Sequence, residues 1–328
     1  MSMVHTTHRF SAAIGFDGYI DRIARVVSGY ESDSVMYFDN ITKFSGALRA
    51  MAGLSGDLEL VTEQIKIGGN APLIGLGLAE AGVNVTLISA TNHDIFKTLH
   101  ENIKCISYGM PGDTLALEFA DGKLMFADIS SMRESVIAAV NNKQLHTEIE
   151  KAYTIADLCI LTNWACMAEM QRLWEIAASS ISKRKDEPYV LMDLADFTKR
   201  RNEDIHSLIN FIRSLKNCKP YLGLNEKETL MLAQRIGYTQ DKPVRAAQLI
   251  HNAANCEVIV HGIGYSLYSG LDGELTKENK IAKHPVISTG AGDRFNAAFG
   301  FALLQGYTIE NALNHANQTA YKYVTTGG

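Results

Sequence analysis

The chain has 328 residues, which is enough for one large α/β domain or two small ones. Its hydrophobic content of 46% and charged content of 20% are typical of a globular enzyme and exclude a disordered polymer. The formal net charge of −5 argues against a nucleic-acid-binding surface, so we expect no nucleic-acid partner.

The sequence also indicates a cytoplasmic protein. There is no apolar run of about 18 residues, the length needed to span a bilayer, so we expect no membrane partner. The first ten residues, MSMVHTTHRF, lack the apolar stretch of a signal peptide. The five cysteines form no CxxC pair and are odd in number, which favours reduced thiols.

Residues 9–16 (RFSAAIGF) are expected to form the first buried strand, and two carboxylates, Asp17 and Asp21, follow its end. Ligands of open parallel sheets bind beyond the carboxyl ends of the strands, so this position favours a functional role. The competing explanation is a simple turn, because Asp-Gly is a turn dipeptide. We predict that at least one of the two aspartates binds substrate, and their spacing does not decide which.

The segment between Asp21 and Gly68 is longer than the connection that a plain βαβ unit requires. Within it, residues 39–53 are expected to be helical, with Asp39 as the N-cap. Residues 58–67 then alternate like a strand. We interpret this excursion as a lid element.

Two adjacent glycines, Gly68 and Gly69, precede Asn70 and a predicted helix over residues 71–81. Glycines let a ligand approach the backbone closely, and the amide of Asn70 offers both a donor and an acceptor. We therefore assign these three residues to the substrate site.

Two further glycines, Gly75 and Gly77, look like part of a dinucleotide-binding fingerprint. Both fall inside the predicted helix, and no glycine occupies position 80. Close helix packing is the better explanation, which argues against a dinucleotide-dependent oxidoreductase.

Residues 114–128 (TLALEFADGKLMFAD) predict a hairpin, because two alternating runs are joined by Asp121-Gly122. We expect Glu118 and Lys123 to be solvated or cross-strand charges rather than ligands. The hairpin either extends a sheet or leaves the core as part of a lid.

Strand and helix patterns alternate from residue 157 to residue 225, which predicts a parallel, doubly wound sheet flanked by helices. Asn163, Asp193 and Asp196 fall at the ends of predicted strands, so all three belong to the functional edge by topology. Of these, Asn163 is assigned to the substrate site.

Asn225 and Glu228 begin a predicted helix, and their spacing puts both side chains on one face of its first turn. Mg²⁺ prefers oxygen ligands and keeps several waters, so this pair could hold the ion through water beside ATP phosphates. An ordinary Asn N-cap with an acidic first turn is the competing explanation.

Residues 288–306 (STGAGDRFNAAFGFALLQG) contain a glycine-rich loop and then apolar residues at helical spacing. Gly290, Ala291 and Gly292 free the backbone so that N–H groups point outward, and the helix adds its positive end. This combination predicts an anion site for phosphoryl oxygens. Asp293 supplies a carboxylate at its mouth, placed to take a proton from an attacking hydroxyl.

Three motifs in order resemble those of the ribokinase-like, or PfkB, carbohydrate kinases. The resemblance covers nearly the whole chain and is carried by IKIGGNAPLIGLGLAEAG (65–82), NEKE (225–228) and GAGDRFNAAFGFAL (290–303). It implies a single ribokinase-like domain over residues 1–328, with a doubly wound sheet and a small β lid within residues 18–67 and 105–130. In that family an Asp after the first strand binds sugar hydroxyls.

The resemblance also implies a nucleotide site. The strand-turn-strand segment 256–270, with Gly262 and Gly264 in its turn, would line the nucleotide. His261 precedes this turn and is expected to be structural within the nucleotide site rather than catalytic. Asn317, in the predicted last helix 309–325, resembles the family's Asn near adenine.

Two positions depart from the family pattern. Leu73 stands where the glycine motif usually carries Asn, which leaves the identity of the sugar open. Ile287 stands where many members carry an Asp associated with a monovalent-cation site, so K⁺ activation is not expected.

The sequence therefore predicts an ATP- and Mg²⁺-dependent kinase that phosphorylates a hydroxyl of a sugar or sugar-like molecule, with Asp293 as the base. A nucleoside kinase of the same fold and a non-catalytic ligand-binding member are the alternatives. The presence of both Asp293 and Glu228 argues against the non-catalytic alternative. No feature decides the oligomeric state, and a homodimer formed through the lid stays open.

Overall fold

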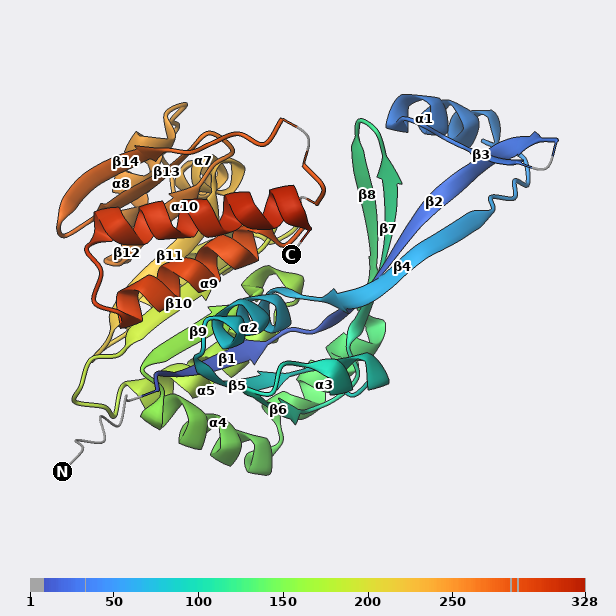
Figure 1. The fold of residues 1–328 in the computed structure, drawn as a ribbon. Helices are drawn as coiled ribbons and strands as arrows, with labels where there is room; N and C mark the ends of the chain where they lie inside the picture. The colour runs from blue at the N-terminus through green and yellow to red at the C-terminus, as the bar shows by residue number, and fades with distance from the viewer. Residues whose placement is uncertain (1–8, 33, 284, 288, 328) are drawn as a thin grey trace, which may run out of the picture.

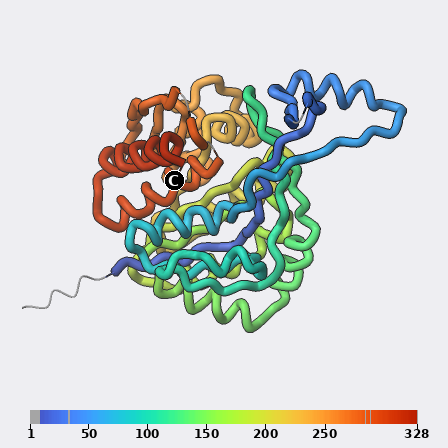
Figure 2. The backbone as a smooth tube through the Cα atoms, turned by 45° about the vertical axis from the view of Figure 1, so that its right-hand side comes forward, coloured from blue at the N-terminus to red at the C-terminus, as the bar shows by residue number. Residues whose placement is uncertain are grey.

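The computed structural model describes residues 9–32, 34–283, 285–287 and 289–327. Two sheets organise this part of the chain, one of nine strands and one of five. Helices cover both faces of the larger sheet, whereas the smaller sheet projects away from the rest of the molecule (Figure 1). Figure 2 shows the same projection from a second direction.

The larger sheet is mainly parallel, as predicted. Its spatial order is β14-β13-β12-β11-β10-β9-β1-β5-β6, and only β13 and β14, at one edge, run antiparallel to their neighbours. The strands are β1 (Ser11–Phe16), β5 (Asn84–Ser89), β6 (Ile103–Ser107), β9 (Leu158–Thr162), β10 (Tyr189–Asp193), β11 (Lys219–Asn225), β12 (Glu257–His261), β13 (Tyr265–Gly270) and β14 (Gly273–Glu278).

The helices form two layers with separate apolar cores. One layer packs α2, α9 and α10 on the sheet, and the other packs α3 to α8 on the opposite face (Figure 1). Within the described ranges, no helix combines the length and apolar character that crossing a bilayer requires. The helices are α2 (Asn70–Glu80), α3 (Ser130–Val140), α4 (Lys143–Ile155), α5 (Met170–Ile181), α6 (Asn202–Ser214), α7 (Glu226–Arg235), α8 (Pro243–Ala254), α9 (Ala291–Leu304) and α10 (Ile309–Thr326), with the short 3₁₀ turns η1 (Asp94–Thr98) and η2 (Trp164–Cys166).

The smaller sheet is built around one long strand, β2, which pairs with β3, β4 and β7. The predicted hairpin forms its other edge, because β7 pairs antiparallel with β8. The elements are β2 (Tyr19–Glu31), β3 (Ser34–Tyr37), α1 (Ile41–Ala50), β4 (Leu60–Gly68), β7 (Gly112–Phe119) and β8 (Gly122–Asp128).

Helix α1 covers the smaller sheet through Phe44, whose ring lies 5.5 Å from those of both Phe38 and Phe119. The predicted N-cap of this helix is wrong by one residue. Asn40, not Asp39, caps α1, because the Asn40 side chain accepts a hydrogen bond from the N–H of Lys43 at 2.8 Å.

The parallel strands all point their carboxyl ends toward the same edge of the larger sheet. β1, β9, β10, β11 and β12 end at or immediately before Asp17, Asn163, Asp193, Asn225 and His261, respectively. The fold therefore brings together polar side chains that are distant in sequence, as topology predicted.

Helices α2 and α9 approach each other closely at Gly77. A Cβ atom on Gly77 would lie 2.8 Å from the Cβ of Ala297, which is closer than real carbon contacts allow. Gly75, two residues earlier on α2, has ordinary space, with 3.6 Å to Cγ1 of Val85. Gly77 therefore serves close helix packing, as the sequence indicated, whereas the space around Gly75 does not require glycine.

We expect Gly77→Ala to lower the free energy of unfolding by about 1–3 kcal/mol, because α2 and α9 must move apart. Alanine's higher helix propensity, worth up to about 1 kcal/mol, opposes this loss. Gly75→Ala is the matched control, which receives the same propensity gain without the clash. Urea unfolding of both variants measures the difference, and a Gly77→Ala protein as stable as the control would contradict the packing argument.

Candidate active site

The first turn of α9 forms the centre of the site. Gly290 is its N-cap with a φ of 87°, a left-handed conformation that glycine adopts without strain. The first N–H groups of a helix have no acceptor within the helix, and the dipole adds positive potential there. This end of α9 is therefore suited to an anion, as predicted. Ser288, which opens the predicted loop, lies outside the described residues.

Asp293 lies in this first turn and is only 8% exposed. Its Oδ1 accepts a hydrogen bond from Nδ2 of Asn70 at 2.9 Å, which joins the start of α9 to the start of α2. Burial, and then the nearby charge of Asp193, raise the pKa of Asp293 well above its usual range, while the bond from Asn70 opposes this. The two glycine loops predicted from the sequence, at Gly69 and at Gly290, therefore meet at the carboxylate of Asp293.

Asp17 immediately follows β1, and its environment differs from that of Asp21, which lies within β2. It is fully buried, and both of its carboxylate oxygens accept hydrogen bonds from protein donors. These donors are the N–H groups of Asn70 (2.8 Å) and Ala71 (3.1 Å), the hydroxyl of Thr162 (2.6 Å) and Nδ2 of Asn163 (3.0 Å). Asp17 thus caps α2 and fixes the loop at Gly69.

Asp21 lies on β2, and its carboxylate packs directly against Gly68. A Cβ atom on Gly68 would lie 2.4 Å from Oδ1 of Asp21, so only glycine leaves room for this side chain. Burial raises the pKa of Asp21, while Lys66 and a hydrogen bond with Thr114 lower it. Among the two predicted aspartates, Asp21 is the one that borders a cavity.

We call that cavity, of about 510 Å³, the Asp21 cavity. The predicted residues in its wall are Asp21, Gly69, Asn70, Asn163 and Asp293. The residues that the sequence did not assign to a substrate site are Tyr19, Leu73, Thr114, Met125, Ala127, Ile129, Ala165, Cys166, Ala195, Asp196, Thr198, Lys199 and Thr289.

A second cavity, of about 370 Å³, lies on the other side of the α9 start, and we call it the His261 cavity. The predicted Asn225, His261, Gly262, Ala291, Gly292 and Asn317 line it, and Gly264 does not. The remaining lining residues are Ile263, Asn279, Lys280, Ala282, Pro285, Phe295, Ala320, Tyr321 and Val324.

The start of α9 is the wall that both cavities share. Ala291 and Gly292 face the His261 cavity, whereas Thr289 and Asp293 face the Asp21 cavity. A group held at this helix end can therefore be reached from both sides, which is the geometry that a transfer between two bound molecules requires.

Gly292 is required at this wall, because a Cβ atom there would lie 2.9 Å from Cε1 of His261. The His261 ring lies 5.4 Å from that of Phe295, and burial lowers the pKa of His261 to about 4. The imidazole is therefore neutral at neutral pH and packs as an aromatic side chain.

Asn225 and Glu228 form a reciprocal capping box at the start of α7. Oδ1 of Asn225 accepts from the Glu228 N–H, and Oε2 of Glu228 accepts from the Asn225 N–H, both at 2.9 Å. Burial and the charge of Asp193 raise the pKa of Glu228 to about 8. No group of three or more His, Cys, Asp or Glu side chains among the described residues could hold a metal ion alone.

Asn296 is a site residue that sequence reasoning missed. It is fully buried, and its Nδ2 donates to Oδ2 of Asp193 at 2.7 Å, while its Oδ1 has no hydrogen-bond partner. Asp193 also accepts from the N–H of Ala195 at 2.9 Å, and burial raises the pKa of Asp193 to about 6. The available signal was the three-residue spacing from Asp293, which puts both side chains on one face of α9.

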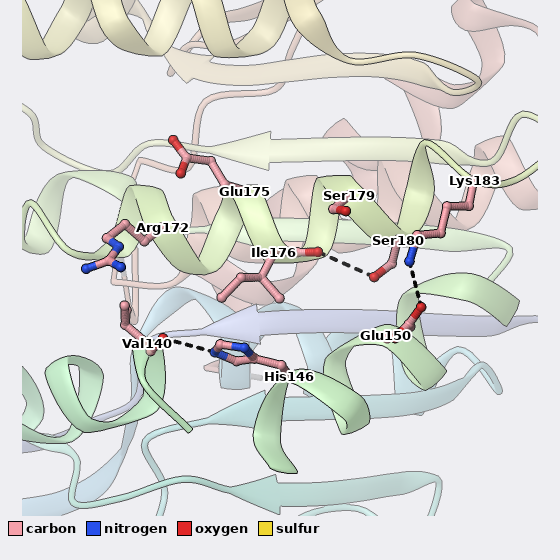
Figure 3. Close-up of a pocket in the computed structure, with 9 residues that line it drawn as sticks. All are labelled: Val140, His146, Glu150, Arg172, Glu175, Ile176, Ser179, Ser180 and Lys183. Carbon is pink, nitrogen blue, oxygen red and sulfur yellow. Dashed lines mark hydrogen bonds and ion pairs between the residues drawn. The ribbon is translucent and has the colours of Figure 1, made fainter. Parts of the chain in front are cut away.

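A further cavity, of about 420 Å³, lies between α4 and α5 (Figure 3). It contains none of the residues predicted for substrate, nucleotide or metal. Among its polar groups, Nζ of Lys183 donates to Glu150, and Nε2 of His146 is hydrogen-bonded to the carbonyl of Val140.

Comparisons with known proteins agree with this geometry. The model of a family described as prokaryotic ketohexokinase matches residues 4–328. A ketohexokinase of Haloferax volcanii is 23% identical over 323 residues, covering 95% of this chain and 86% of that protein. The ribokinase of Thermotoga maritima has a TM-score of 0.64 at 18% identity, covering 98% of this chain and 94% of that one. An Arabidopsis thaliana ribokinase complexed with ribose and ATP has a TM-score of 0.65 at 16% identity, with coverage of 98% and 94%.

Proposed function

The chain belongs to the prokaryotic ketohexokinase family and is an ATP-dependent carbohydrate kinase, and we propose that its acceptor is a ketohexose bound in the Asp21 cavity. The observation that carries this proposal is the shared wall at the start of α9, with an anion site between two cavities. The acceptor class follows from the family description and the ketohexokinase relative.

The nucleotide is assigned to the His261 cavity, whose lining is largely apolar and carries Asn317 and Asn225 as polar groups. Asn317 is buried, and its Nδ2 donates to Oγ of Ser266 at 2.9 Å, so its position is fixed. In this arrangement the phosphates extend toward Ala291 and Gly292, where the backbone N–H groups of the α9 start meet the transferred group.

The transfer step uses Asp293 as the base. The acceptor hydroxyl oxygen forms a bond to the γ-phosphorus, and the bond from that phosphorus to the β–γ bridging oxygen breaks. The electron pair of the broken bond stays on ADP, and the hydroxyl proton passes to the Asp293 carboxylate. Asn70 holds Oδ1 of Asp293, which leaves Oδ2 for the proton.

Mg²⁺ is assigned to the edge of the His261 cavity, where Asn225 lines the wall and its capping partner, Glu228, carries a second set of oxygen atoms. The described residues contain no cluster of three or more His, Cys, Asp or Glu side chains that could hold a metal ion. Waters and ATP phosphates would therefore supply the remaining ligands, as is common for Mg²⁺. When bound, it would neutralise phosphate charge beside the buried carboxylates.

The smaller sheet is assigned as a lid on a single domain, because β2 and β8 supply Asp21, Met125 and Ala127 to the substrate cavity. Its strands β2, β3 and β4 also expose apolar side chains, among them Tyr30, Met36 and Ile65, which suit a homodimer formed through the lid. Light scattering in solution tests this assembly.

All five cysteines lie among the described residues without disulfides, which agrees with a cytoplasmic location.

Replacing Asp293 by Asn should lower turnover by about 10²-fold or more, with ATP affinity nearly unchanged. The Asn side chain still accepts the hydrogen bond from Asn70, so the fold should persist. In the wild type the base must be ionised, and its raised pKa places the acid limb of the pH profile above 3.8, the ordinary carboxyl value. Asp57→Asn, which changes an exposed aspartate, controls for the lost charge. If Asp293→Asn has the same turnover as this control, Asp293 is not the base.

Replacing Asp21 by Ala should raise the KM for the sugar about 10- to 100-fold and leave the KM for ATP nearly unchanged, because a buried acceptor for sugar hydroxyls is lost. Asp17→Ala should instead lower the melting temperature, because four protein donors lose their acceptor. Steady-state kinetics and thermal unfolding of both variants test the assignment. An unchanged sugar KM in Asp21→Ala would remove Asp21 from the acceptor site.

Replacing Glu228 by Gln should raise the Mg²⁺ concentration needed for half-maximal activity, because the Glu228 carboxyl can release its proton and hold the hydrated cation as an anion, whereas an amide stays neutral. Glu226→Gln is the matched control, since Glu226 is exposed in the same turn and its carboxylate accepts from the Tyr265 hydroxyl at 2.7 Å. If the two variants require the same Mg²⁺ concentration, Glu228 does not bind the ion and serves only as a helix cap.

A further inference from the structure

The tip of the β7–β8 hairpin contacts the loop that leads into α9. Nζ of Lys123, the second residue of β8, donates a hydrogen bond to Oγ1 of Thr289, which immediately precedes Gly290. The two residues are 166 positions apart in the chain. Lys123 also faces Glu118 across the hairpin, as its strand register requires. The expectation that Lys123 is only a solvated or cross-strand charge is therefore incomplete.

We infer that Lys123 is a further catalytic residue, whose ammonium group binds the transferring phosphoryl group from the lid side. This inference rests on the proposed function, because it requires a phosphoryl group at the start of α9. It assigns to the hairpin a chemical role in addition to covering the cavity.

The position of Thr289 places the ammonium group beside the transfer point. Thr289 lines the Asp21 cavity together with Asp293, and its carbonyl accepts a hydrogen bond from the Tyr323 hydroxyl at 3.0 Å. α10 thus holds the loop on one side while the hairpin contacts it on the other. Figure 1 shows the hairpin rising beside the body of the molecule on the side where α9 begins.

The charge environment of Lys123 suits an anionic ligand. In the described part of the chain, no carboxylate lies within ion-pair distance of its Nζ. Partial burial and the nearby Lys66 both lower the pKa of Lys123, although Glu118 and Asp21 oppose them. An ammonium group has three donors, and the Thr289 hydroxyl accepts only one of them, so phosphoryl oxygens can take the others.

Arg294, the cation closest in sequence to Asp293, is committed elsewhere. Its guanidinium forms an ion pair with Glu80 and lies 5.1 Å from the centre of the Tyr323 ring. These contacts hold α9 to α2 and α10. Lys123 is therefore better placed than Arg294 to stabilise the negative charge that develops during phosphoryl transfer.

The test compares Lys123→Met and Lys123→Arg with Lys43→Met, which removes an exposed lysine of α1 in the same sheet assembly. Turnover is measured with fructose and Mg·ATP, and affinity is measured calorimetrically for Mg·AMP-PNP and Mg·ADP. We expect Lys123→Met to lower turnover about 10²-fold, as loss of one transition-state donor does. It should weaken AMP-PNP binding about tenfold and leave ADP binding unchanged, because ADP lacks the γ-phosphoryl group. Lys123→Arg should restore part of both losses.

Two results would overturn the inference. One is a Lys123→Met protein that matches Lys43→Met in turnover and in AMP-PNP affinity. The other is equal weakening of AMP-PNP and ADP, which would place Lys123 away from the γ-phosphoryl group. If wild type and Lys43→Met both fail to phosphorylate fructose, the proposed acceptor is wrong, and the AMP-PNP to ADP comparison still decides the role of Lys123.

Discussion

The hydrogen bond from Asn70 to Asp293 is the contact on which the arrangement of the site depends. It joins the first turns of α2 and α9, and the two helices can reach each other only because Gly77 lets α9 approach. Asp17 then fixes the start of α2 from the sheet side with its four hydrogen bonds. A buried carboxylate is costly unless donors surround it, so the same contacts that hold the fold also hold Asp293, the proposed base, in position.

Much of this site could be predicted because its signals are local. Glycine loops before helices, such as those at Gly69 and Gly290, need conformations or close approaches that only a few residue types permit. The parallel sheet followed from alternating strand and helix patterns, and topology then placed Asn163 and Asp193 at one edge. The Asn225–Glu228 spacing suggested a metal site, with an Asn N-cap as the competing explanation, and the structure shows the cap as a reciprocal capping box.

The remaining features depend on contacts that no local pattern encodes. Asp17 and Asp21 look equivalent in sequence, and only the pairing of β2 with β4 and β7 turns Asp21 toward a cavity. Asn296 was not singled out from the sequence, because its hydrogen-bond partner, Asp193, lies 103 residues away. Lys123 was interpreted from its hairpin neighbour, Glu118, although it also contacts Thr289, in the loop before α9, 166 positions away.

The division of β1 and β2 between the two sheets has a thermodynamic consequence. Asp17 ends the strand of the larger sheet, whereas Asp21, four positions later, belongs to the smaller sheet together with the hairpin of Lys123. In the proposed arrangement, a sugar bound to Asp21 and a phosphoryl group bound to Lys123 would both hold the smaller sheet against the larger one. If each ligand favours that closed arrangement, each would increase the affinity for the other, and linkage makes the two factors equal, so the two substrates would be coupled without a separate regulatory site.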